Sequence, residues 1–177
     1  MAKKIMIIMA IVVVVLVNNV KAKEVIIPDN AIRIRIIANS NSFKDQFIKG
    51  QVRDSLQLEI NEMLANVKTI EEARSILNKN LKKFDFVVEK VLKRNNVDLN
   101  YNINYGMNYF PEKEFKGVNY NEGYYESIVV TLGKGKGNNW WCVLFPPLCL
   151  MESEEKDMDD IEYKSFIKEK IDAFFKN

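Results

Sequence analysis

The stretch IRIRIIANSNSFKDQFIKGQVRDSL, residues 32–56, changes its hydrophobic period in the middle. Its first part alternates isoleucine with arginine, which is typical of a strand with one buried face. After the polar segment ANSNS, apolar residues recur every three or four positions, which predicts an amphipathic helix to about Ala65. Ser42 stands three residues before Asp45, the spacing of a helix capping box. The change of period therefore predicts a strand followed by a helix.

The rest of the chain continues with both periods. Thr69 opens a second helical run to Arg94, and Asn78 and Asn80 leave two alternatives, a coiled coil or two helices; we favour helices packed on a sheet. The same patterns predict three further strands and a terminal helix, at residues 99–105, 124–132, 140–145 and 161–174. This order is typical of an α+β domain, with a mainly antiparallel sheet of about four strands and helices packed on one face.

A glycine-rich segment, GKGKG at residues 133–137, separates the last two predicted strands. A Walker loop needs a lysine followed by serine or threonine at the start of a helix, and the dinucleotide fingerprint needs a glycine where Asn138 stands. A predicted strand follows instead, so we do not expect nucleotide binding at this segment. The segment is interpreted as a hairpin connection with Lys134 and Lys136 at its tip.

The N-terminus has the pattern of an export signal. Two lysines precede thirteen apolar residues, 5–17, and this run is shorter than the roughly 17 to 25 residues that span a bilayer. We predict a signal peptide over residues 1–22 and a single secreted domain over 23–177, with an uncleaved anchor as the alternative. Removal of 1–22 changes the count from 26 basic against 24 acidic residues to 23 against 24. Nucleic-acid binding is therefore not expected, because the mature chain has no net positive field.

The two cysteines of an exported chain favour a disulfide over a metal site. Cys142 and Cys149 would close a loop of eight residues, which contributes roughly 2.5 kcal/mol in the chain-entropy model. The chain has no histidine, which argues against a transition-metal site and against a triad with an imidazole base. Candidate acid–base carboxylates are scattered along the sequence, at Asp45, Asp54, Glu112, Glu122 and Glu126. We therefore expect no catalytic, cofactor or metal site.

Both tryptophans lie in the stretch NNWWCVLFPPLC, residues 138–149. If residues 140–145 are extended, both faces of the strand are apolar, with Trp140, Cys142 and Leu144 on one and Trp141, Val143 and Phe145 on the other. Burying one tryptophan removes 150–250 Å² from water, worth at most about 4–6 kcal/mol, so at least one is expected in the core. Two interpretations remain: a central strand ending in a disulfide-pinned turn, or an exposed apolar surface for a partner protein.

The segment GKGKGNNWWCVLFPPLC, together with residues 32–56, closely resembles the stage II sporulation protein R family. The resemblance extends from about residue 32 to residue 150, and the departures at Gly50 and at 121–123 lie outside the long motif. It implies an intercellular signal rather than an enzyme. Family members are exported into the intermembrane space between forespore and mother cell. There they activate a membrane-embedded aspartic protease that processes pro-sigma-E.

Under this hypothesis, six residues form or support the contact with the extracytoplasmic part of the protease: Asn139, Trp140, Trp141, Phe145, Pro146 and Pro147. Cys142 and Cys149 would pin the turn. Two other classes stay open. A small secreted hydrolase would need two carboxylates in one cleft, and an exported envelope-binding module could also use exposed aromatic side chains.

Overall fold

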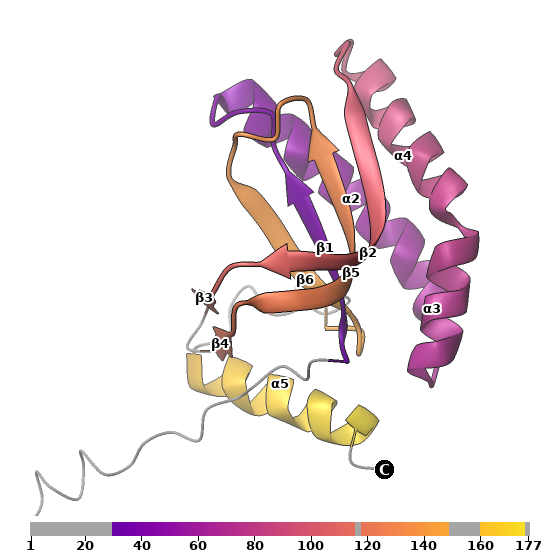
Figure 1. Ribbon diagram of the computed structural model, residues 1–177, viewed down its shortest axis with the longest axis vertical. Helices are drawn as coiled ribbons and strands as arrows, with labels where there is room; N and C mark the ends of the chain where they lie inside the picture. The colour runs from indigo at the N-terminus through magenta and orange to yellow at the C-terminus, as the bar shows by residue number, and fades with distance from the viewer. Residues whose placement is uncertain (1–29, 116–117, 149–159, 176–177) are drawn as a thin grey trace, which may run out of the picture.

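A mixed four-stranded sheet, covered on one face by three helices, forms most of the computed structural model, which describes residues 30–115, 118–148 and 160–175 (Figure 1). The elements are β1 (Ile32–Ile37), α2 (Phe43–Leu64), α3 (Ile70–Lys79), α4 (Leu81–Arg94), β2 (Tyr101–Phe110), β3 (Lys113–Phe115), β4 (Val118–Tyr120), β5 (Gly123–Leu132), β6 (Asn139–Phe145) and α5 (Asp160–Phe175). The predicted α+β class is confirmed. The predicted signal at 1–22 lies outside the described residues.

Strand β1 lies inside the sheet, whose order is β2-β5-β1-β6. It pairs parallel with β5 and antiparallel with β6, and β2 pairs antiparallel with β5. The predicted hairpin connection at 133–137 is therefore wrong, because β1 separates the two strands that this segment joins. The segment instead crosses the end of β1.

The crossing segment is held by the residues that follow β1. The backbone N–H of Gly137 donates to the Ala38 carbonyl oxygen at 2.8 Å. The side-chain oxygen of Asn39 accepts from the N–H of Lys134 at 2.9 Å. A Cβ at Gly137 would lie 2.3 Å from the Ser40 carbonyl oxygen, so the two segments touch backbone to backbone. The two sequence stretches that carry the family resemblance thus meet at this end of the sheet.

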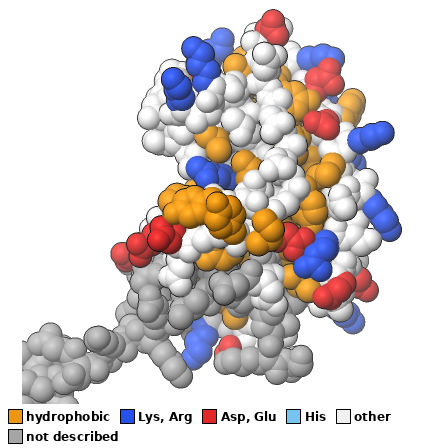
Figure 2. Space-filling model, viewed as in Figure 1, with side chains coloured by type: hydrophobic (Ala, Val, Ile, Leu, Met, Phe, Trp, Pro, Cys, Tyr) orange, Lys and Arg blue, Asp and Glu red, His pale blue; other side chains and the backbone are white. Residues whose placement is uncertain are grey.

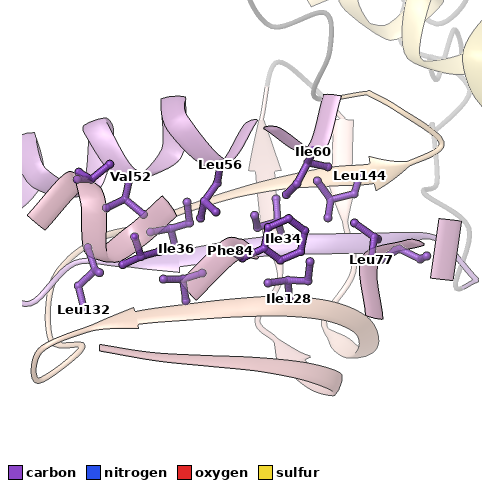
Figure 3. Packing of buried hydrophobic residues seen from close by; sticks show 14 of the residues in the cluster. Ile34, Ile36, Val52, Leu56, Ile60, Leu77, Phe84, Ile128, Leu132 and Leu144 are labelled. Atoms are coloured by element: carbon purple, nitrogen blue, oxygen red, sulfur yellow. The ribbon is translucent and has the colours of Figure 1, made fainter. Parts of the chain in front are cut away.

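The main hydrophobic core lies between the sheet and the three helices α2, α3 and α4 (Figure 3). The isoleucines of β1 at positions 32, 34 and 36 are at most 1% exposed, as their alternation predicts. Helix α2 buries one residue per turn toward the sheet: Ile48, Val52, Leu56, Ile60 and Leu64. Phe84 of α4 is fully buried in the same cluster. A smaller cluster joins Ile167 of α5 to Val143 on β6.

The helix boundaries follow the capping signals. The backbone N–H of Asp45 donates to Ser42 Oγ at 3.2 Å, and the N–H of Glu72 donates to Thr69 Oγ1 at 3.3 Å. At the next boundary, the side chain of Asn80 donates to the carbonyl oxygen of Ile76 at 2.8 Å and separates α3 from α4. The favoured prediction of separate helices packed on a sheet is confirmed.

Candidate functional site

The tryptophan motif lies on β6, which is an edge strand of the four-stranded sheet. Within this sheet β6 pairs with β1 alone, so the interpretation of a central strand is wrong. Trp140 stands opposite Ile36, and Trp141 stands opposite Arg35. Because side chains alternate along a strand, the two tryptophans point to opposite faces of the sheet.

Trp140 faces the helices. Its half-buried side chain packs against the main core, beside Cys142. The guanidinium carbon of Arg53, on α2, lies 5.9 Å from the centroid of the Trp140 ring. This placement makes Trp140 a support for the edge of the core, consistent with the expectation that one tryptophan packs there.

Trp141 faces the side of the sheet opposite to α2, α3 and α4, which we call the open face. Its ring meets the Phe110 ring edge-to-face, with centroids 5.3 Å apart and an interplanar angle of 81°. The ammonium nitrogen of Lys113 lies 5.1 Å from the Trp141 ring centroid, within cation–π range. The side chain is half-buried, so part of its surface remains available to a partner.

The prediction that Phe145 shares a face of the strand with Trp141 is wrong. The register between β1 and β6 shifts between Ile32 and Arg33, which places Phe145 opposite Ile32 on the helix side. Phe145 is 2% exposed and belongs to the main core. Pro146 is buried after a cis peptide bond, and Pro147 is half-buried. Phe145 and Pro146 can therefore support a contact surface from beneath.

Asn139 begins β6 and holds Arg35 of the neighbouring strand. With its amide oxygen turned toward Arg35, that oxygen accepts from Nη2 at 2.8 Å and from Nε at 3.2 Å. Arg35 Nη1 donates to the backbone oxygen of Tyr109 at 3.3 Å. Burial lowers the pKa of Arg35. Arg35, Asn139 and Trp141 thus form a polar and aromatic group on the open face, which we call the Arg35 site.

The predicted disulfide falls partly on residues that the structure describes. Cys142 is half-buried on the helix side of β6 and packs against the main core. Cys149 lies outside the described residues. The pairing of the two cysteines, and its role in pinning the turn after Pro147, stay predictions.

A second surface was missed in the sequence. Met107, Tyr109 and Tyr124, which we call the tyrosine patch, are 63%, 47% and 68% exposed on the paired strands β2 and β5. The centroids of the two tyrosine rings lie 5.6 Å apart, in an edge-to-face contact. Tyr109 Oη donates to Glu122 Oε2 at 2.7 Å. Hydrophobic side chains also reach the surface in Figure 2, at the level where β2 and β5 bend. The alternation of residues 101–105 continues past Gly106, a signal that would have extended the predicted strand.

Four of the five scattered carboxylates, Asp45, Asp54, Glu122 and Glu126, are engaged by different groups. Asp45 accepts from Ser40 and Asn39, and the hydrogen bond from Ser40 lowers the pKa of Asp45. Asp54 pairs with Arg53 at 2.7 Å on the surface of α2. Within the described ranges, no three acidic or cysteine side chains gather as metal ligands. In the same part of the chain, no helix has the length and apolar character of a membrane span.

Glu126 accepts hydrogen bonds from two residues, Arg74 and Tyr105. It accepts two bonds of 2.8 Å from Arg74, one from Nε and one from Nη2, and a bond of 2.5 Å from Tyr105 Oη. The hydrogen bond from Arg74 is the main cause that lowers the pKa of Glu126, while burial raises the pKa of Tyr105. The contact joins α3 to β5 on the helix side of the sheet.

The Arg74–Glu126 pair is expected to stabilise the fold in a pH-dependent way. Because the folded pKa of Glu126 is depressed, its contribution is present above the unfolded value of about 4.3 and is lost as the pH falls through the folded value. A double-mutant cycle with Arg74→Gln and Glu126→Gln should give a coupling free energy of about 1 kcal/mol at pH 7. This coupling free energy, measured by urea unfolding, should decrease steadily below pH 5. An equal coupling free energy at pH 7 and pH 3 would contradict a stabilising ion pair between Arg74 and Glu126.

Comparisons with known proteins agree with the motif resemblance. The profile of the family described as stage II sporulation protein R matches residues 28–155. The stage II sporulation protein R of Bacillus subtilis (strain 168) is 36% identical over 151 residues, which cover 83% of this chain and 67% of that protein. No solved structure gives a significant match. The chain therefore belongs to the stage II sporulation protein R family and is a protein of sporulation.

Proposed function

We propose that the chain is a secreted signalling protein, without enzymatic activity, that acts between forespore and mother cell. Its partner would be the extracytoplasmic part of a membrane-embedded aspartic protease, and binding would activate removal of the pro-sequence of sigma-E. The match to the family over residues 28–155 is the observation that carries this proposal. The matched region contains the whole described sheet and its three covering helices.

The described surface supports binding to another protein. The tyrosine patch exposes the residue types that are enriched at protein interfaces. It adjoins the Arg35 site through Tyr109, whose ring contacts Tyr124 while its backbone oxygen accepts from Arg35. The strand that carries the exposed Tyr109 therefore reaches Arg35 of β1.

Deletion of the gene tests the proposal in the host. Pro-sigma-E should accumulate, and an export-competent copy of the gene should restore cleavage on an immunoblot. A copy without residues 1–22 should fail, because it would not reach the intermembrane space. Normal cleavage in the deletion strain would remove the proposed function.

Replacement of Trp141 by alanine tests the place of contact. Hot-spot aromatic residues contribute about 2 kcal/mol or more to binding, so the exported variant should support processing at least about tenfold less well at limiting amounts. Phe86→Ala is the matched control, because Phe86 is an exposed aromatic residue on α4. Equal processing by both variants, at equal levels of folded protein, would place the contact elsewhere.

A further inference from the structure

The open face of the sheet is basic and rich in amides. Strand register places these side chains on it: Arg33, Arg35, Ile37, Asn102, Asn104, Asn108, Phe110, Ser127, Val129, Thr131, Asn139, Trp141 and Val143. Two of these described positions are arginines, four are asparagines and none is acidic. The face therefore favours a negatively charged ligand.

The two arginines differ in what surrounds them. Arg33 is 1% exposed, and its guanidinium carbon lies 3.3 Å from the centroid of the Tyr125 ring. Arg35 is only half-buried, and its guanidinium carbon lies 5.8 Å from the centroid of the Phe110 ring. Arg35 is thus the arginine of this face that a ligand can reach.

The hydrogen bonds that Arg35 makes leave its positive charge and two of its N–H donors available to an anion. Its contacts within the described residues are to neutral groups, the Asn139 amide oxygen and the Tyr109 backbone oxygen. A guanidinium has five N–H donors, and these contacts occupy the one on Nε, one on Nη1 and one on Nη2. One N–H remains on each terminal nitrogen, the arrangement that binds both oxygens of a carboxylate. Among the described residues, no carboxylate forms an ion pair with Arg35.

We propose that the Arg35 site binds a carboxylate side chain from an acidic segment of the partner protein. The half-buried ring of Trp141, which packs against the fully buried Phe110, provides an apolar wall for the stem of a glutamate or aspartate. The exposed Asn102 and Asn104 of β2 can bond to the peptide groups of the same segment, which a small free anion lacks. The inference rests on the proposed function for the existence of a protein partner and adds the chemistry of the segment that is recognised.

Binding of a blocked hexaglutamate peptide to the exported protein tests the site. The Trp140→Phe background leaves Trp141 as the single tryptophan, so its fluorescence reports binding beside Arg35. The signal should titrate with hexaglutamate, weaken as salt is added and be absent with hexaglutamine. Equal binding of both peptides, or binding of inorganic phosphate at the same concentrations, would overturn recognition of an acidic protein segment.

Two variants and one control tie the binding to Arg35. Arg35→Gln should weaken hexaglutamate binding at least about tenfold, because a charge-assisted bidentate contact is lost. Asn139→Asp should weaken hexaglutamate binding as much while keeping the fold, because the new carboxylate would form an ion pair with the Arg35 guanidinium and compete with the peptide. Asn138→Asp is the matched control, since it makes the same charge change one residue away at an exposed position.

The outcomes separate this inference from the proposed function. If Asn139→Asp and Asn138→Asp weaken peptide binding equally, the effect is general charge and the Arg35 site is wrong, whatever the deletion strain shows. If Arg35→Gln and Asn139→Asp bind like the parent, the site is also wrong. Normal sigma-E cleavage in the deletion strain would remove the protease as partner but would leave the measured peptide affinities intact.

Discussion

Replacement of Gly137 by alanine is expected to lower the free energy of unfolding by about 3 kcal/mol, near the upper end for overpacked sites. The added Cβ would lie 2.3 Å from the Ser40 carbonyl oxygen and 2.8 Å from the Ala38 Cβ. The first of these atoms belongs to the backbone and cannot move aside like the end of a flexible side chain. The clash would also disturb the 2.8 Å bond from the Gly137 N–H to the Ala38 oxygen.

Gly50→Ala is the matched control for this prediction. Gly50 lies inside α2, and a Cβ there meets nothing within 4 Å. Alanine should therefore raise the free energy of unfolding by about 0.5–1 kcal/mol through helix propensity and a less flexible unfolded chain. Urea unfolding of the exported variants, fitted with a common slope, gives both values. A loss below about 1 kcal/mol for Gly137→Ala would mean that the crossing segment is not tightly held against the end of β1.

The local structure was predictable because it depends on neighbouring residues. The change of period after residue 38 marks the boundary between β1 and α2, and the cap on Ser42 needs a residue only three positions away. The side of β1 that faces the helices followed from its alternating isoleucines. These features are set by strand and helix geometry alone.

The order of the strands could not be predicted from the same patterns. Strands that follow one another in sequence usually lie side by side, and this rule favours a hairpin connection at residues 133–137. The position of β1 between β5 and β6 depends on pairing between distant segments, for which the periodicity of each strand carries no signal. The edge position of β6, and with it the surroundings of both tryptophans, was missed for this reason.

Errors at the candidate site have a similar origin. A shift of one residue in strand pairing moves a side chain to the other face, and the irregularity beside Ile32 brings Phe145 into the core in this way. The alternation of β1 does not predict that Arg33 is buried. The ring of Tyr125 that covers Arg33 comes from β5, which pairs with β1 but is distant in the sequence. The asparagine that holds Arg35 was among the predicted contact residues, but its role depends on the register between β1 and β6.

Replacement of Phe84 by alanine is expected to lower the free energy of unfolding by about 3–5 kcal/mol, the largest change predicted for this chain. Phe84 is fully buried between α4 and the sheet, in the cluster that includes Ile34 and Ile128 (Figure 3). Removal of the ring forfeits its burial and leaves a cavity that the rigid sheet cannot close. Since domains are commonly stable by about 5–15 kcal/mol, the loss would take a large part of the total.

Phe86→Ala separates the effect of burial from that of losing an aromatic residue. Phe86 lies two positions further along α4 and is 63% exposed, so its replacement should change the free energy of unfolding by no more than about 0.5 kcal/mol. If Phe84→Ala does not fold, Phe84→Leu should cost less, because leucine keeps most of the buried volume. Similar losses for Phe84→Ala and Phe86→Ala in urea unfolding would contradict the packing of α4 on the sheet. The position of Arg35 and Trp141 on the open face depends on that packing, because α2, α3 and α4 cover the opposite face of the sheet, while α5 packs at Val143 on the open side.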